Sequence, residues 1–391
     1  MEAVTTTRAA EFPTLRGGIA YLDSSATSQT PLPVIEAMTR YYADYRASVH
    51  RGIYPIAAEA TEAFESARSR TAEWLGWDAQ TTIFTPNATG AINLVARGTV
   101  GKGDLVVLTE MEHHSNIVPW QLAGARLEYV RVDDEGQLDL DELLAKGPKA
   151  VSVVHVSNVL GTINPVEEIV RRARAAGALS VVDGAQAVPQ LPVDVGAIDA
   201  DFYAWTAHKA YGPTGIGVLH GRRELLEEMP PLIGGGHMIK RVDPDSSTWT
   251  DLPWKFEAGT SAVAEAIGLG AAVDWLSGIG MESVRSHEGL ITAYALERLS
   301  AVDGIKVHGP RDAERRGALV SFEMDGLHPH DVAEILGRDG VCIRAGHHCA
   351  QPLMRRLGVT ATSRASFAVH TTSDEVDRLV DGLEEVKRVL G

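Results

Sequence analysis

Cysteine is scarce in this sequence, since 391 residues contain only Cys342 and Cys349. Two cysteines seven positions apart make neither a disulfide framework nor a C-x-x-C pair. Their scarcity favours a reducing compartment. Long apolar runs are also missing, because no stretch approaches the roughly 20 residues of a membrane span. The polar start MEAVTTTRAAEF does not resemble a signal peptide. We therefore expect a cytoplasmic protein with no membrane partner.

Positive charge is the other deficit. The chain has 36 Lys and Arg against 52 Asp and Glu, which gives a net charge of −16. Nucleic acids and anionic membranes require a clustered positive surface, so this balance argues against both as partners. Apolar residues make up 45% of the chain and charged residues 23%, as in ordinary globular proteins. The length allows two domains.

Short β-branched runs alternate with helical stretches between about residues 80 and 220. Strands are expected at 81–85, 104–109, 126–132, 150–156, 178–184, 201–205 and 215–221. Apolar strands separated by helices are typical of a parallel sheet that is covered on both faces. The pattern therefore predicts an α/β fold with a mainly parallel seven-stranded sheet.

The pattern changes in the last third of the chain. We expect a helix over 287–299, strands at 318–324 and 340–344, and a final helix that Ser373 caps. Its apolar face would comprise Val376, Leu379, Val380, Leu383, Val386 and Leu390. This predicts a large domain of residues 17–277 and a small α+β domain of residues 278–391, which the N-terminal arm 1–16 joins.

Polar side chains follow almost every expected strand. In open α/β sheets the functional site lies at the carboxyl ends of the strands, so these positions are the candidates. They are Asn87 and Thr89, His113 and His114, Ser157 and Asn158, Asp183 and Gln186, and Thr206, His208 and Lys209. A lysine, a carboxylate, hydroxyls at a helix start and a flat ring are the groups that bind pyridoxal phosphate (PLP).

Each residue also has a simpler interpretation. Asp183 alone is a common turn residue, and Lys209 alone is typical of a solvated surface position. His113 and His114 alone would fit a surface pair or part of a zinc site. The joint arrangement favours the PLP hypothesis.

Six segments carry a resemblance to a known family. They are EMEHHSNIVPW, HVSNVLGTINP, VDGAQAV, TAHKAYGPTGIG, FEAGT and RAGHHCAQPLM. Together they resemble the PLP-dependent cysteine desulfurases of the class V aminotransferase family, and more narrowly their Suf-type (group II) branch. The similarity runs from YLDSSATSQTP (21–31) to the C-terminal helix. It implies the type I fold of PLP-dependent transferases.

The resemblance also implies roles for individual residues. Lys209 would carry PLP covalently, and Asp183 would pair with its pyridine nitrogen. Thr260 would reach the phosphate in the partner subunit's site, which implies a homodimer with shared sites. The remaining expected cofactor contacts are His113 on the ring face, Gln186 and Asn158 at the phenolate oxygen, and Thr89, Thr206 and His208 at the phosphate.

Cys349 would be the catalytic nucleophile. By this resemblance it takes sulfur from L-cysteine, leaving L-alanine and a persulfide. A SufU-type or SufE-type acceptor protein then receives that sulfur for iron–sulfur cluster assembly. The expected contacts to the substrate are Arg364 at its carboxylate, Asn158 and Arg344. A thiol is mostly protonated at neutral pH, so a stabilising group is expected nearby, with His347, His348 and Arg344 as candidates.

Adjacent His and Cys residues rarely ligate one tetrahedral ion, so we expect no metal site in His347–His348–Cys349. Cys342 is expected to be buried in a strand. His330 matches the place of a histidine that is thought to engage the zinc of a SufU-type acceptor, although a helix-start histidine beside Asp331 is the alternative.

The sequence departs from the family pattern at several places. Asn87-Ala88-Thr89-Gly90 replaces the usual G-T-T-E, His370-Thr371 replaces Tyr-Asn, and His237 follows a glycine run. These departures are compatible with a sulfur donor that serves one particular pathway. Selenocysteine lyase, cysteine sulfinate desulfinase and a PLP-free sulfur-carrier or scaffold protein with the same fold also stay open.

Overall fold

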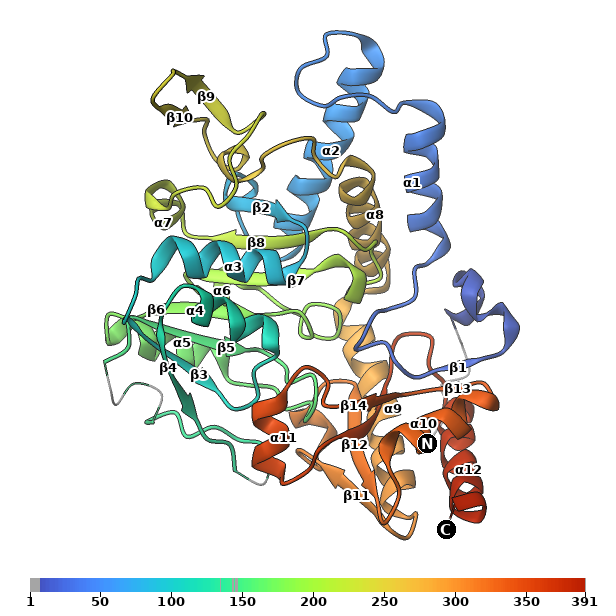
Figure 1. Cartoon of the computed structure of the whole chain (residues 1–391). Coiled ribbons are helices and arrows are strands. Elements are labelled where there is room, and N and C mark those ends of the chain that lie inside the picture. Colours follow the sequence, from blue (N-terminus) through green and yellow to red (C-terminus); the bar gives the residue numbers. More distant parts are fainter. Residues whose placement is uncertain (1–7, 134, 143, 145–146, 391) are drawn as a thin grey trace.

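The computed structural model describes residues 8–133, 135–142, 144 and 147–390 (Figure 1). Residues 1–7 of the expected N-terminal arm lie outside this part. The rest of the arm forms two short 3-10 helices, Arg8–Glu11 and Pro13–Gly17. Phe12 between them is fully buried, and its ring centroid lies 5.6 Å from that of Trp275 and 6.1 Å from that of Tyr211. The described part of the arm is therefore packed onto the core.

The central sheet contains all seven expected strands in the order β2-β8-β7-β6-β5-β3-β4. They are β2 (Thr82–Thr85), β3 (Leu105–Thr109), β4 (Arg126–Val130), β5 (Ala150–Val154), β6 (Leu179–Asp183), β7 (Phe202–Thr206) and β8 (Gly217–Gly221). Strand β8 is antiparallel to both of its neighbours, and the remaining pairs are parallel. The prediction of a mainly parallel seven-stranded sheet is confirmed.

Helices cover both faces of this sheet (Figure 1). Along β3, Val106 and Leu108 pack into the core beneath α3 and α4, whereas Val107 packs into the core on the other face. This alternation of two apolar faces explains the continuous apolar strands of the sequence. The main covering helices are α2 (Pro55–Trp74), α3 (Ala88–Thr99), α4 (Val118–Leu122), α5 (Val166–Ala175) and α8 (Val263–Ile279). The Asn87 side chain accepts a hydrogen bond of 2.9 Å from the Gly90 N–H and so caps α3.

The other elements of this region lie at its margins. They are α1 (Leu32–Asp44), α6 (Val195–Ile198), α7 (Arg223–Glu228), and the hairpin of β9 (Ile239–Val242) and β10 (Ser247–Trp249). The hairpin and the α1–α2 connection project from the same end of the molecule (Figure 1). Within the described residues no single helix is long and apolar enough to cross a membrane; only α8 with α9 (Met281–Ser300), bent by 76°, has the combined length and composition.

A second sheet lies in the C-terminal region, with the antiparallel order β11-β12-β15-β14. Its strands are β11 (Ile305–His308), β12 (Leu319–Met324), β15 (Thr362–Ser366) and β14 (Arg344–Gly346), and its helices are α9, α10 (Pro329–Arg338), α11 (Gln351–Leu357) and α12 (Ser373–Leu390). The strand expected over 340–344 is split. Val341–Cys342 (β13) pairs in parallel with Ala20–Tyr21 (β1), whereas Arg344–Gly346 pairs with β15. Cys342 is only partly buried there.

The expected domain boundary at 277/278 lies inside α8, two residues before its end. The chain bends at Gly280, whose φ of 83° suits glycine, and α9 then leads from the large sheet to the small one (Figure 1). The division into two domains stays a prediction.

The final helix begins one residue earlier than its expected cap requires. Thr372 is the cap, because its hydroxyl accepts from the Glu375 N–H at 3.3 Å and the Glu375 carboxylate accepts from the Thr372 N–H at 2.9 Å. This reciprocal pair is a capping box. Ser373, which we expected to be the cap, is the first helical residue. The apolar face is buried as predicted except at Leu390, which is exposed.

This capping box predicts different effects of two neighbouring substitutions. Thr372→Ala should lower the free energy of unfolding by about 1 kcal/mol, because it removes the acceptor for the Glu375 N–H. Ser373→Ala should change it by less than about 0.5 kcal/mol. Urea denaturation of both variants checks this, and equal effects would contradict the assignment.

Candidate active site

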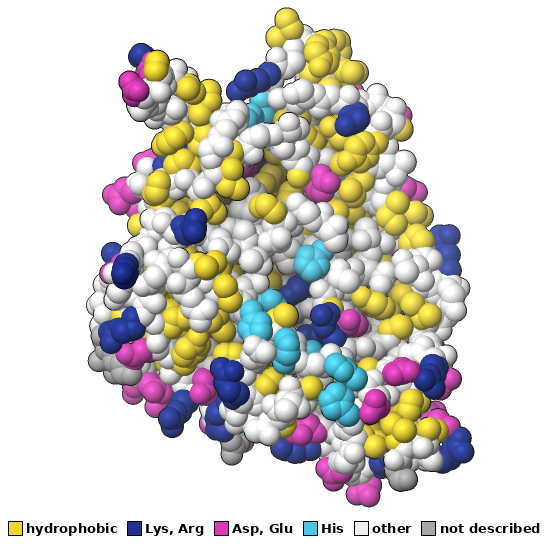
Figure 2. Space-filling view, viewed as in Figure 1, with side chains coloured by type: hydrophobic (Ala, Val, Ile, Leu, Met, Phe, Trp, Pro, Cys, Tyr) yellow, Lys and Arg dark blue, Asp and Glu magenta, His cyan; other side chains and the backbone are white. Residues whose placement is uncertain are grey.

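A cavity of about 220 Å³ lies at the carboxyl ends of the large-sheet strands, where the small sheet covers them. Figure 2 shows histidine side chains gathered on this face beside Lys and Arg side chains. Of the residues that the sequence singled out, those lining the cavity are Thr89, His113, Asn158, Asp183, Gln186, Thr206, His208, Lys209, Arg344, Cys349 and Arg364. Asn87 and His348 line it as well, whereas His114, Ser157, His347 and Thr260 are not among its lining residues.

Lys209 and Asp183 lie at the ends of neighbouring strands, as the sequence predicted. Asp183 ends β6, and Lys209 ends the 3-10 turn Ala207–Lys209 that follows β7. Burial lowers the pKa of Lys209 to about 8, although the Asp183 charge opposes this shift. Burial raises the pKa of Asp183, which the Ala185 N–H and Lys209 partly offset. The amine is therefore partly unprotonated near neutral pH, as a nucleophilic lysine requires.

His113 is held as a neutral ring. Its Nδ1 accepts a hydrogen bond of 3.1 Å from the Ser115 N–H, so the ring proton belongs on Nε2. Burial lowers the pKa of His113 to about 3, with a further contribution from Lys209. An uncharged, flat imidazole is therefore exposed to the cavity.

The start of α3 forms an anion cradle. Gly217 of β8 lies so close beneath the β2–α3 turn that a β-carbon there would be 2.5 Å from the Asn87 Cα. Ala88 and Thr89 of this helix start line the cavity, and the Thr89 hydroxyl lies 2.7 Å from that of Ser115. The start of a helix suits an anion because its first N–H groups have no partner within the helix. Thr206 and His208 complete the cradle.

His208 contributes to the cradle as a neutral ring. Its Nδ1 lies 3.2 Å from the Thr27 hydroxyl. Burial lowers the pKa of His208 to about 4, and the Lys209 charge adds to the shift. His208 can therefore hydrogen-bond an anion but brings no positive charge at pH 7.

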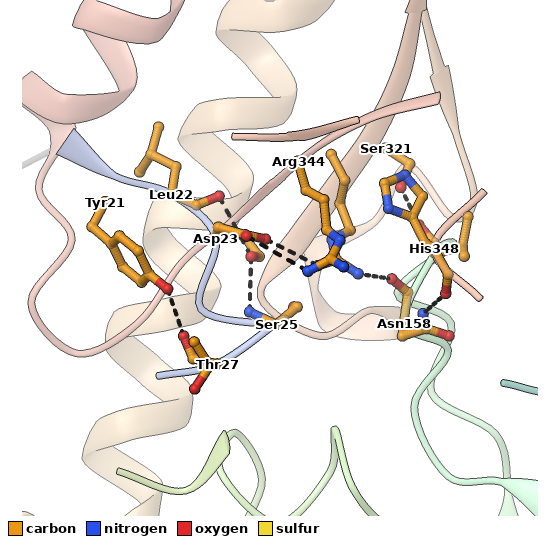
Figure 3. Close-up of polar contacts among 12 residues, drawn as sticks. Tyr21, Leu22, Asp23, Ser25, Thr27, Asn158, Ser321, Arg344 and His348 are labelled. Carbon is orange, nitrogen blue, oxygen red and sulfur yellow. Dashed lines mark hydrogen bonds and ion pairs between the residues drawn. The ribbon is translucent and has the colours of Figure 1, made fainter. Parts of the chain in front are cut away.

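Arg364 is a buried cation with two partners from distant segments, Asp23 and Asn158, both of which Figure 3 labels. Its Nη1 donates to the Asn158 carbonyl at 2.9 Å, and its Nη2 donates to the Asp23 carboxylate at 3.1 Å. Its buried Nε has no hydrogen-bond partner among the described residues. Asp23 also lies 3.9 Å from Arg344. The guanidinium therefore keeps donor capacity for the carboxylate of a ligand.

Asp23 was not anticipated from the sequence. It belongs to YLDSSATSQTP, which contributed to the family resemblance without a role for any side chain. Burial raises the pKa of Asp23, and Arg364 and Arg344 oppose that shift. The sequence signal that could have identified Asp23 is its place directly after the apolar pair Tyr21 and Leu22.

The two amide side chains are partly occupied by protein contacts. The Gln186 Nε2 donates to the Ser25 carbonyl at 2.8 Å, and its Oε1 accepts from Gln190 at 3.2 Å. The Asn158 Nδ2 donates to the His348 carbonyl at 2.7 Å, whereas its buried Oδ1 has no partner among the described residues. Asn158 thus keeps a free acceptor, and the roles of both amides toward a cofactor stay predictions.

Cys349 reaches the cavity from the small sheet, three residues after β14. The ring of His348 is turned to Thr362, with Nε2 at 3.1 Å from the carbonyl and 3.0 Å from the hydroxyl. Burial lowers the pKa of His348 to about 3, and Arg364 adds to the shift. His348 is therefore neutral, and the expectation that it could supply positive charge to the thiol is wrong. Arg344 lines the same cavity and keeps its charge.

Residues 20–379 match the model of the aminotransferase class-V family. This chain belongs to that family.

Two curated relatives of this class-V family member illustrate the similarity. A probable cysteine desulfurase from Streptomyces coelicolor is 50% identical, over 95% of this chain and 93% of the relative. A cysteine desulfurase from Haloferax volcanii is 49% identical, over 95% and 90%. Among solved structures, the apo cysteine desulfurase from Thermococcus onnurineus NA1 is 39% identical with a TM-score of 0.94, and the match covers 99% of this chain and 100% of that one.

Thr260 lies apart from the cavity in this class-V family member. It lines a separate hollow of about 640 Å³ together with Arg51, His237 and Ser261. Its expected role in the site of a partner subunit stays a prediction. In the described part of the chain, no group of three or more His, Cys, Asp or Glu is placed to hold a metal ion.

The cavity's donor set fits PLP. A buried amine of lowered pKa, a buried carboxylate, a neutral ring and an anion cradle match the aldehyde, pyridine nitrogen, ring face and phosphate of that cofactor. Lys209, Asp183, His113 and Thr89 are the residues that would hold it. The unpaired Oδ1 of Asn158 leaves one more polar atom for it.

The lowered pKa of Lys209 predicts its reactivity. In protein freed of cofactor, acetylation of Lys209 by acetic anhydride should rise about tenfold per pH unit and level off near pH 8, because only the neutral amine reacts. Asp183→Asn should move the plateau to lower pH, since the Asp183 charge raises the pKa of Lys209. Peptide mass spectrometry measures this, with the exposed Lys306 as an internal reference. A plateau above pH 10 would disprove the assignment.

Proposed function

We propose that this chain is a PLP-dependent cysteine desulfurase of the Suf-type (group II) branch, which converts L-cysteine to L-alanine and forms a persulfide on Cys349. One observation carries the proposal: Cys349 of the small-sheet region lines the same cavity as Lys209, Asp183 and His113 of the large sheet. The names of the relatives support it. A selenocysteine lyase would have less need of a catalytic thiol at position 349 than a cysteine desulfurase has.

Different residues act on the carboxylate, the α-carbon and the sulfur of L-cysteine. Arg364 binds the substrate carboxylate with the N–H groups that its protein partners leave free, while Asp23 and the Asn158 carbonyl hold the guanidinium in place. Bound PLP supplies an electron sink for the substrate's α-carbon. Lys209, whose pKa is lowered to about 8, moves the proton at this carbon, because part of its amine is unprotonated near neutral pH. Asp183 holds a proton on the ring nitrogen, and His113 covers the ring face.

The sulfur step belongs to Cys349. Its thiolate attacks the sulfur of the substrate, so that an S–S bond forms and the Cβ–S bond breaks. The electron pair of the broken bond stays with the substrate carbon, which takes up a proton to become the methyl group of L-alanine. The enzyme retains the sulfur as a persulfide, and no external oxidant or reductant is needed.

Later transfer of that sulfur needs a partner. We propose a homodimer in the cytoplasm that hands the persulfide sulfur to a SufU-type or SufE-type acceptor for iron–sulfur cluster assembly. His330 at the start of α10 is exposed, and its Nε2 lies 3.9 Å from where a β-carbon of Gly346 would stand. Gly346 lies three residues before Cys349, so His330 is close to the thiol segment. This closeness supports contact between His330 and an acceptor's metal.

The proposal predicts a covalent product. Incubation with L-cysteine should increase the intact mass by one sulfur atom on Cys349, since persulfide formation needs both the thiol and the bound cofactor. Cys349→Ser and Lys209→Ala should show no gain, whereas Cys342→Ser should behave as the wild type. A wild-type protein that gains no sulfur would overturn the function, and so would sulfur located on Cys342. Alanine release by Cys349→Ala from selenocysteine but not from cysteine would identify a second activity.

Arg364→Lys tests the carboxylate site. A lysine cannot pair both carboxylate oxygens in a fork, so KM for L-cysteine should rise roughly tenfold or more while kcat falls less. Steady-state alanine production measures both constants. Arg338→Lys on the exposed face of α10 is the matched control and should change neither. An unchanged KM in Arg364→Lys would remove Arg364 from substrate binding.

A further inference from the structure

We propose that Asn158 and His114 are positioning residues that clamp the Cys349 segment in a left-handed backbone turn and so fix the thiol at the cavity. The inference rests on the proposed role of Cys349 as nucleophile. It concerns how the chain presents that thiol.

The backbone of this segment is unusual. His348 has a φ of 50° and Cys349 a φ of 55°, so two consecutive residues with β-carbons occupy the left-handed region. This region is costly for residues other than glycine, and it is populated only where surrounding contacts enforce it. The turn therefore needs external contacts to persist.

His114 supplies contacts on one side. Its backbone N–H donates to the Cys349 carbonyl at 2.7 Å, and its Nε2 accepts from the Gln351 N–H at 3.1 Å. His114 directly follows His113, whose ring faces the cavity, in the connection after β3. The thiol segment and the neutral ring are thus tied to the same short turn.

Asn158 supplies the contact on the other side (Figure 3). Its Nδ2 donates to the His348 carbonyl at 2.7 Å, between two buried residues. Its own carbonyl accepts from Arg364 at 2.9 Å. One residue therefore connects the thiol segment with the arginine that would bind the opposite end of the substrate.

Contacts inside the segment complete the turn. The His347 Nδ1 accepts from the Cys349 N–H at 3.2 Å, and the His347 carbonyl accepts from the Ala350 N–H at 2.9 Å. The His348 ring is anchored on Thr362 of β15. The carbonyls of His348 and Cys349 are both held from the large sheet, so the thiol has a fixed place relative to the cavity.

Replacing one donor tests the clamp. Asn158→Asp keeps the size of the side chain but sets an oxygen against the His348 carbonyl, so the turn should open. Alkylation of Cys349 by iodoacetamide should then become roughly fivefold faster, and persulfide formation from L-cysteine should become slower by a similar factor. His114→Ala, which keeps the backbone contact, should shift both rates the same way but less. Both changes should lower kcat more than they raise KM.

Cys342 in β13 is the internal reference, because general loosening of the fold would speed the alkylation of both cysteines. The control variant is Ser321→Ala, which removes a 2.6 Å hydrogen bond to the Val159 carbonyl beside Asn158 and leaves the thiol segment untouched. It should change neither rate. Unchanged Cys349 alkylation in both Asn158→Asp and His114→Ala would overturn the clamp, as would equal acceleration at Cys342.

Hydrogen exchange on the wild type decides the matter should the variants not fold. The amides of Cys349, Ala350 and Gln351 should exchange as slowly as those in the middle of α11, and exchange at the rate of an open loop would overturn the proposal. Alkylation and exchange need no turnover. A wild type that forms no persulfide would therefore end the desulfurase proposal while the clamp is still decided by these two measurements.

Discussion

The site depends on the neutralisation of one buried cation. A buried guanidinium is stable only with opposite charge and hydrogen-bond partners around it. Arg364 of β15 obtains them from Asp23 near the N-terminus and from the Asn158 carbonyl after β5. Three segments that are remote in sequence are held together by this requirement, and they define one wall of the cavity. Removing Asp23 would leave an uncompensated charge where three parts of the fold meet.

Burial also determines which side chains of the cavity are charged at neutral pH. Burial shifts the pKa values of His113, His208 and His348 far below neutrality, and that of Lys209 to about 8. The nitrogen bases are thus wholly or partly uncharged at pH 7, whereas the two arginines keep their charge. Anionic groups of a ligand are therefore drawn to the guanidinium groups and the start of α3. The neutral bases are left free to accept or donate protons.

Local sequence patterns predicted much of the fold and of the candidate site. All seven strands of the large sheet and the placement of Asp183 and Lys209 at neighbouring strand ends follow from apolar runs and from the carboxyl-edge rule. Contacts between remote segments did not follow. The division of the expected strand 340–344 into two depends on the pairing of β1 with β13. The role of Asp23 depends on its contact with Arg364 of β15. The neutral state of His348 depends on its burial and on the nearby Arg364 charge. The cap at Thr372 lies one residue before the expected one, which is within the usual uncertainty of helix ends.

The pairing of β1 with β13 bears on how the chain is made. Ala20–Tyr21 leaves the ribosome about 320 residues before its partner Val341–Cys342. Throughout that interval the N-terminal strand has an unsatisfied edge. Contacts of such long sequence separation form slowly, because a long loop must close first. The large sheet can assemble during synthesis, whereas the β1–β13 pairing and the Asp23–Arg364 pair must wait until residues 341–364 have been synthesised.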